Sequence, residues 1–256
     1  MFSLERMLKI WAKYSSFYWE GLGKTLIFAL LAVLLGLVLG LALACGRMQR
    51  ASRRQNPVVR GLKGLCRFLC TAYVEVFRAT PMLVQIFIIY YGIGSLIKLP
   101  ETSVNRMFWG MVAVGLNSAA YMSEIIRAGI GAVPPGQMEA ARSLGMTHWQ
   151  AMRRVVFPQA IKNSLPAIGN EFIINIKDSS VLCVLGVSDL MFMTRSVAGI
   201  YYKGTECYLI AATVYLFLTY LSSLLLKAIT GRMTAPDNTK RRQGNQTVDL
   251  GLPSSN

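Results

Sequence analysis

The sequence predicts an all-α integral membrane protein with about five transmembrane helices. Hydrophobic residues make up 54% of the 256 residues and charged residues only 15%, whereas an average soluble domain has about 25% charged residues. The run Leu26–Cys45 contains no charged side chain, and a helix needs about 20 apolar residues to cross the hydrocarbon core of a bilayer. The charged residues lie between such apolar blocks, as in the loops of a membrane protein.

The other expected spans follow the same criterion in chain order. Uncharged stretches cover Ala79–Ile97, Met107–Ser123 and Tyr208–Leu226. Between the last two, Asn163–Ile176 and Ser179–Ser188 flank one charged pair and together predict a span interrupted by charge. We therefore expect transmembrane spans near residues 22–46, 68–97, 107–132, 163–187 and 206–228.

Lys and Arg are unevenly divided between the two sets of loops. The set that includes Arg47–Arg67, Arg127–Lys162 and the C-terminal segment holds 17 of them, and the opposite set holds 7. Cytoplasmic loops carry the excess of Lys and Arg, so the richer set is expected to face the cytoplasm. Residues 1–19 then form an extracytoplasmic N-terminal segment and residues 20–232 the membrane domain. The polar tail 233–256 is expected to be cytoplasmic and disordered.

Composition also excludes some classes of function. The chain has 27 Lys and Arg against 12 Asp and Glu, but a nucleic-acid-binding protein presents such charge on a water-soluble fold. No nucleic-acid partner is therefore expected. The five cysteines form no C-x-x-C pattern and have one His available as a co-ligand, so no metal site is predicted.

The cytoplasmic loop 133–158 carries signals for helices. Pro134 and Pro135 stop the preceding helix, and Gly136 is the expected N-cap of a short helix, with Glu139 three residues later. Ala140 and its neighbour Ala141 favour helix. Gly145 is placed to end that helix in the left-handed conformation.

A second short helix is expected directly after this turn. Thr147 and Gln150 form a capping-box pattern, and Pro158 is expected to end the helix. Two short helices joined by a glycine turn outside the bilayer suit docking onto another protein. The alternative is an amphipathic hairpin that rests on lipid.

These motifs resemble the EAA loop of ABC importer permeases. Within this loop the chain departs mildly from the family pattern at Val155 and Phe157, and small departures also occur at Ala79 and Ser123 in the flanking segments. The flanking segments are similar to the polar amino acid permeases of that family, and the resemblance extends from about residue 25 to residue 233. The residues that carry it are Glu139-Ala140-Ala141, Gly145, Val155-Val156-Phe157-Pro158, and the segments Tyr73–Pro81, Ala120–Arg127 and Asn170–Ser180.

The resemblance implies the type I ABC importer permease fold and the binding-protein-dependent import of polar amino acids. In such a complex this chain would be a non-catalytic subunit of the bacterial cytoplasmic (inner) membrane. It would pair with a second permease, the same or related, and with a cytoplasmic ATPase dimer that binds ATP and Mg²⁺, while this chain holds no cofactor. An extracytoplasmic solute-binding protein would deliver the amino acid. The implied ATPase-coupling residues are Glu139, Ala140, Ala141, Gly145 and Pro158.

A polar stripe marks the fourth expected span. Glu171, Asn175 and Asp178 are spaced i, i+4 and i+7 and so share one helix face, with Asn170 at its edge. Ionisable groups inside a membrane cost about 2.5–3.5 kcal/mol on insertion scales, so they face a cavity or a partner. Our hypothesis is that this stripe lines the substrate pathway. Alternatively, Lys177 and Asp178 lie near a membrane interface, or they pair with groups on the partner subunit and hold the dimer together.

Two other classes of function have less support in the sequence, and the first is an enzyme or self-powered pump. Gly21–Thr25 ends like a phosphate-binding loop, but Tyr18 stands where that loop requires Gly and no strand precedes it. A secondary transporter or channel is the other alternative, although the chain shows no internal repeat that would support an inverted-repeat carrier.

Gly36 and Gly40 form a G-x-x-x-G pattern that permits close helix contact. Arg78 is interpreted as a snorkelling boundary residue in preference to a gating contact.

Overall fold

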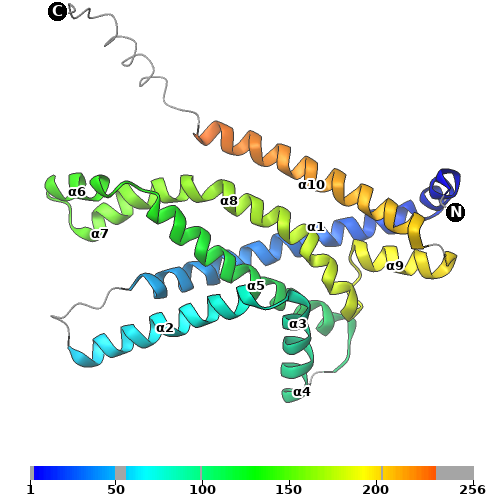
Figure 1. Ribbon diagram of the computed structural model, residues 1–256, viewed down its shortest axis with the longest axis horizontal. Coiled ribbons are helices and arrows are strands. Elements are labelled where there is room, and N and C mark those ends of the chain that lie inside the picture. The colour runs from blue at the N-terminus through cyan, green and yellow to red at the C-terminus, as the bar shows by residue number, and fades with distance from the viewer. Residues whose placement is uncertain (1–2, 50–55, 99, 203, 235–256) are drawn as a thin grey trace, which may run out of the picture.

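The described part of the chain consists of helices joined by short turns and loops. The computed structural model describes residues 3–49, 56–98, 100–202 and 204–234, and it contains no strand within these ranges. Figure 1 shows long helices that run roughly side by side, with two short helices, α6 and α7, at one end and the N-terminus at the other. The elements are α1 (Leu4–Met48), α2 (Pro57–Ala79), α3 (Met82–Phe87), a π-helical turn (Ile88–Ile93), α4 (Gly94–Leu96), α5 (Ser103–Gly131), α6 (Pro135–Ser143), α7 (His148–Ala151), a second π-helical turn (Met152–Val156), α8 (Phe157–Asp178), a 3₁₀ helix (Ser179–Leu185), α9 (Leu190–Tyr201) and α10 (Gly204–Thr234).

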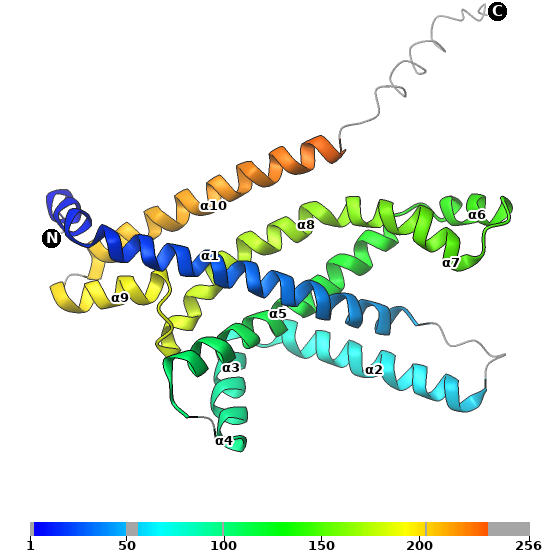
Figure 2. The same cartoon turned by 180° about the vertical axis from the view of Figure 1, so that it is seen from behind.

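Helix α1 begins far earlier than the first expected span. Its 45 residues, at about 1.5 Å each, give a length of about 68 Å, roughly twice the hydrocarbon thickness of a bilayer. Residues 4–19, expected as a separate segment, are part of this helix. Ile10 and Tyr18 anchor it, because both are buried in one apolar cluster with residues of α9 and α10. Figure 2 shows this end of α1 beside α9 from behind.

The expected second span, residues 68–97, is broken. Helices α2 and α3 meet at an angle of 114° at Thr80 and Pro81. Proline lacks an amide hydrogen and disfavours helical conformation in the residue before it. Thr80 is accordingly extended, with φ −110° and ψ 145°. The uncharged stretch therefore forms a second helical segment that turns away from α2.

By length and composition, α1 and α10 are the two described helices apolar enough to cross a membrane, and there are up to four spans if each of two bent helix pairs counts as one. The bent pairs are α2 with α3 and the following turn, and the helix that continues through α8 with α9. Helix α5, expected as a span near 107–132, packs against α1, α2 and α8. A helix enclosed by three neighbours can carry polar side chains without exposing them to lipid.

Small residues bring the central helices together. A Cβ atom on Gly36 of α1 would lie 2.8 Å from the Ser118 Oγ of α5, and one on Gly40 would lie 2.6 Å from the Cβ of Met122. Gly129 of α5 meets Ser164 of α8 in the same way. The G-x-x-x-G pattern of α1 is therefore a true helix-packing surface.

The expected disordered tail, residues 233–256, lies outside the described residues from 235 onward. Its first two residues belong to α10, which ends at Thr234.

Candidate functional site

The hairpin of α6 and α7 forms as predicted around Gly145. This glycine has φ +81°, in the left-handed region that favours glycine. Its amide donates to the Arg142 carbonyl (3.0 Å), and the Met146 amide donates to the Ala141 carbonyl (3.2 Å). These are the two hydrogen bonds of a Schellman motif, which satisfies the last carbonyls of a helix.

The start of α6 differs from the expectation. The N-cap is Pro134 and Pro135 occupies the first turn, so Gly136 lies inside the helix. Proline at the first helical position costs no hydrogen bond, because the amides of the first turn have no intrahelical partner. Glu139 therefore does not cap the helix through Gly136, and its side chain is exposed.

The second short helix starts as predicted but does not end as predicted. Thr147 and Gln150 form both hydrogen bonds of the capping box, at 2.9 and 3.3 Å. Pro158, expected to end the helix, lies in the first turn of α8, and the chain stays helical from His148 to Leu185. The π-helical turn Met152–Val156 directly precedes it. Such a widened turn accommodates a residue that lacks an amide hydrogen.

The exposed face of the hairpin contains residues that the motif alone did not indicate. Ala140 is exposed, whereas Ala141 is buried within the chain. Two large apolar side chains project from the same region, Leu144 with 82% and Trp149 with 70% of its surface exposed. Both residues lie within a few positions of Gly145 in the sequence. These apolar residues beside the glycine are the sequence signal that could have indicated them. These two side chains extend the exposed surface of the hairpin beyond Glu139 and Ala140.

Two residues of the predicted polar stripe join a buried cluster between α5 and α8. The Ser118 hydroxyl donates to Glu171 Oε1 at 3.1 Å. The Asn175 side-chain amide lies 3.1 Å from both the Ser118 hydroxyl and the Glu171 carbonyl. Glu171 is 5% exposed and Asn175 is 3% exposed. One face of α8 thus presents, inside the helix bundle, a carboxylate that accepts a hydrogen bond from Ser118.

The remaining stripe residues lie apart from this cluster. Asn170 is exposed, and Asp178 is half-buried at the C-terminal end of α8. Ser118, which sequence reasoning missed, is 53 residues from Glu171 in the chain. Its only local signal is the run of small residues around it, which indicates close packing but no polar partner.

A groove lies between α5 and α8, nearer the hairpin than the cluster is. It has a volume of about 420 Å³ and is lined by residues of α5 and α8 that include Gly129, Ser164 and Ala167. Ser164 and Ala167 precede Glu171 by seven and four residues, so they share its helix face. The groove and the buried carboxylate therefore lie on the same side of α8.

A second charged cluster surrounds Glu124 of α5. Arg47 of α1 lies 2.7 Å from it, Arg127 lies 2.6 Å from it, and Arg78 of α2 lies 3.6 Å from it. Arg78 also lies over the ring of Tyr121, 5.7 Å from its centre. Arg78 thus forms an ion pair within the chain, which neither the snorkelling nor the gating interpretation included.

Comparison with known proteins yields one family. A family described as "Binding-protein-dependent transport system inner membrane component" matches residues 58–235. Similar proteins include a "Probable amino-acid permease protein YxeN" of Bacillus subtilis, 37% identical over 86% of this chain and 92% of that protein. The "Arginine transport system permease protein ArtQ" of the same organism is 34% identical over 86% and 94%. The "Nopaline transport system permease protein NocM" of Agrobacterium fabrum is 36% identical over 79% and 81%.

Solved structures show the same architecture. A chain from the "Crystal structure of an amino acid ABC transporter with histidines" superimposes with a TM-score of 0.77 and 39% identity, covering 91% of this chain and 99% of that chain. A chain of the MetNI methionine ABC transporter matches with a TM-score of 0.70 at 18% identity, covering 87% and 98%. The second match supports the fold alone.

Proposed function

This chain belongs to the inner-membrane components of binding-protein-dependent transport systems and is a permease subunit of an amino acid ABC importer. We propose that Glu171 contacts the amino acid during its passage through the membrane. We also propose that the hairpin of α6 and α7 couples this movement to an ATPase. The fold is that of type I ABC importer permeases. The sequence-based interpretation of fold and function is thus confirmed.

The proposed substrate contact depends on one observation, the buried carboxylate of Glu171 without a counter-cation. Among the described residues, no Lys or Arg lies within 4.0 Å of it. A charge buried in a membrane protein normally pairs with another charge or marks a pathway. The ammonium group of an amino acid carries the complementary charge and donates hydrogen bonds that a carboxylate accepts. Ser118 donates to the carboxylate, and Asn175, which donates to the Ser118 hydroxyl, holds Ser118 in position for that contact.

The polar amino acid class follows from the relatives and from the stripe. The relatives named above are described as transporting arginine and nopaline, and others as transporting glutamine. A second carboxylate, Asp178, lies seven residues from Glu171 on the same stripe. We propose polar amino acids as the substrates and Asn175 and Asp178 as further pathway residues. Asn170, which is exposed at the edge of the stripe, would face a partner or the pathway.

Coupling is proposed to run along one helical rod. The chain stays helical from His148 to Leu185, and Trp149 and Glu171 are 22 residues apart on it, or about 33 Å at 1.5 Å per residue. A protein that grips Glu139, Ala140 and Trp149 can therefore move Glu171. The π-helical turn beside Pro158, and Pro166 inside α8, are where this rod can bend. The ATPase dimer would bind ATP and Mg²⁺ and hydrolyse the nucleotide.

We further propose that the hairpin lies in the cytoplasm, with the N-terminus outside and the C-terminus inside. The hairpin and the start of α1 lie at opposite ends of the molecule (Figure 1), as this orientation requires. The excess of Lys and Arg on the hairpin side supports the same direction. A second permease subunit would complete the pathway, and an extracytoplasmic solute-binding protein would supply it.

The test is uptake of labelled amino acids into proteoliposomes that carry the full complex and its solute-binding protein. We expect Glu171→Gln to lower uptake by roughly tenfold or more, because a hydrogen bond to a charged group contributes about 1.5–3 kcal/mol. Glu101→Gln, which alters an exposed loop carboxylate, is the matched control and should transport normally. Unchanged rate and apparent affinity in Glu171→Gln would refute the substrate contact.

A further inference from the structure

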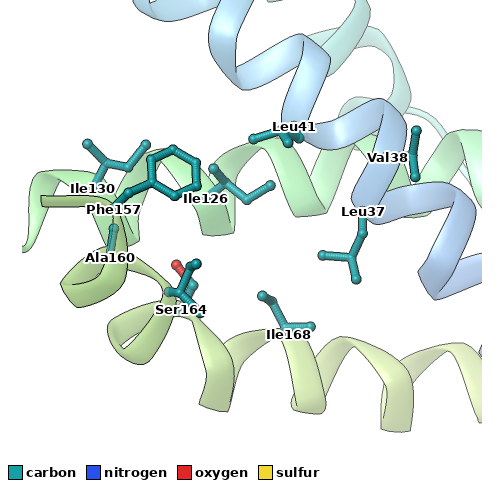
Figure 3. A pocket seen from close by; sticks show the side chains of 10 residues that line it. Leu37, Val38, Leu41, Ile126, Ile130, Phe157, Ala160, Ser164 and Ile168 are labelled. Atoms are coloured by element: carbon teal, nitrogen blue, oxygen red, sulfur yellow. The ribbon is translucent and has the colours of Figure 1, made fainter. Parts of the chain in front are cut away.

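An apolar cavity opens between three helices at the hairpin end of the molecule. Figure 3 shows side chains of α1, α5 and α8 around it, among them Leu37, Leu41, Ile126 and Ile168. Its volume is about 370 Å³, and Ser164 is the one polar residue in its lining. Such an apolar lining offers few hydrogen-bond partners to water, whereas a hydrocarbon chain in the cavity buries its apolar surface against the lining.

A cationic pocket adjoins this cavity. It has a volume of about 420 Å³, and its lining includes Arg47 at the end of α1, Arg67 of α2 and Arg127 of α5. Ile130 lines both spaces, so an apolar cavity and a cationic pocket share a wall. This is the arrangement that an amphiphilic molecule with an anionic head requires.

The charges in the cationic pocket are not balanced within the described chain. Arg47 and Arg127 share the single carboxylate of Glu124, which also pairs with Arg78. Arg67 is exposed, and no described carboxylate lies within 4.0 Å of it. A phosphate diester can accept hydrogen bonds from two guanidinium groups at once.

The depth of the pocket fits the surface of a bilayer. Arg47 follows the uncharged run of α1 by one residue, Gly46, so it lies where the hydrocarbon core ends. Basic pockets between transmembrane helices at this depth are typical binding sites for anionic lipid headgroups.

We propose that an anionic phospholipid occupies both spaces, with one acyl chain in the apolar cavity and its phosphate against Arg47, Arg67 and Arg127. The apolar cavity favours a lipid over free phosphate or a nucleotide, because neither of these has a hydrocarbon chain that could fill it. The proposal concerns a lipid-facing site and is independent of the substrate contact at Glu171.

The test is native mass spectrometry of the full complex, purified in detergent and titrated with phosphatidylglycerol or with phosphatidylcholine of identical acyl chains. We expect the complex to retain phosphatidylglycerol selectively. Arg67→Gln should reduce that retention about fivefold, because a basic residue near an anionic surface contributes roughly 1 kcal/mol. Arg60→Gln removes the same charge from an exposed position of the same helix, outside the pocket, and should have no effect.

The apolar half is tested with Ile161→Trp, which fills the cavity, against Leu225→Trp on the exposed face of α10. Loss of retained phosphatidylglycerol in the first variant alone would support the proposal. Equal retention of the two lipids, or equal effects of Arg67→Gln and Arg60→Gln, would overturn it. Displacement of phosphatidylglycerol by millimolar inorganic phosphate would also overturn it, since a free-phosphate site would then explain the arginines.

Discussion

The guanidinium of Arg47, at the end of α1, and the carboxylate of Glu124, within α5, lie 2.7 Å apart although 77 residues separate them in the chain. Both side chains are largely shielded, with 11% and 20% of their surfaces exposed. Glu124 therefore ties the end of α1 to α5 and also pairs with Arg127 and Arg78. Its removal would leave three guanidinium groups close together without an anion.

We expect Glu124→Gln to lower the free energy of unfolding of the complex by about 1–3 kcal/mol, below the full cost of breaking a buried pair because the site is partly exposed. The measurement is the thermal unfolding midpoint in detergent. Glu20→Gln is the control, because it removes an exposed i, i+4 pair with Lys24 and such pairs contribute about 0–1 kcal/mol. Equal midpoint shifts in the two variants would contradict the role assigned to Glu124.

The hairpin turn gives a prediction about backbone conformation. Gly145→Ala should weaken the turn by about 1–2 kcal/mol, because the left-handed conformation strains any residue with a Cβ atom. The space around Gly145 is open, so the cost comes from the backbone alone. The measurement is ATP-driven uptake by the reconstituted complex, which should fall while binding of the solute-binding protein to its amino acid stays normal.

Gly136→Ala is the matched control for this change. Gly136 lies inside α6 and also has open space around it, but its φ is not positive. Alanine should therefore stabilise α6 by up to about 1 kcal/mol. Reduced uptake in Gly136→Ala together with normal uptake in Gly145→Ala would show that the shape of the turn does not matter for transport.

Local signals predicted the hairpin well, because its structure depends on residues close together in the chain. Gly145 and the Thr147–Gln150 pair act over three to five residues, and both predictions were confirmed. Pro158 failed as a terminator, because a π-helical turn before it kept the helix continuous. The rule that proline ends a helix considers the proline alone, so it could not account for the π-helical turn that precedes Pro158.

Contacts between distant helices could not be predicted in the same way. The periodicity of α8 placed Glu171 and Asn175 on one face, but it did not indicate that Ser118 would meet them. Helix periodicity gives the direction of a side chain and leaves its partner open. The partner depends on how closely α1, α5 and α8 approach, which Gly36 and Gly129 decide.

The packing at Gly36 links this close approach to the polar cluster. A Cβ atom there would lie 2.8 Å from Ser118 Oγ and 3.2 Å from the Ser118 backbone. Gly36→Ala should therefore displace Ser118 and weaken its hydrogen bond to Glu171, at a cost of about 1–3 kcal/mol. Both the unfolding midpoint and amino acid uptake should fall. Gly23→Ala, in the same helix with open space around it, should leave both unchanged or raise stability slightly.

The elbow between α2 and α3 depends on Gln85. Its side-chain amide nitrogen lies 2.8 Å from the Phe77 carbonyl and 2.9 Å from the Thr80 carbonyl, and its oxygen accepts from Asn117 of α5 at 2.9 Å. These bonds satisfy carbonyls that the break at Pro81 leaves without helical partners. Gln85→Leu should lower the free energy of unfolding by about 1–3 kcal/mol, because it leaves buried polar groups unpaired.

A double-mutant cycle separates this network from a general packing effect. Gln85→Leu and Asn117→Ala should each lower the unfolding midpoint, and their combination should cost less than the sum by about 0.5–3 kcal/mol, as for residues that share hydrogen bonds. Asn117 also lies 3.3 Å from the Phe77 carbonyl, so both side chains act on the same end of α2. Strictly additive effects would mean that the two amides act independently, and would contradict a shared hydrogen-bond network at the elbow.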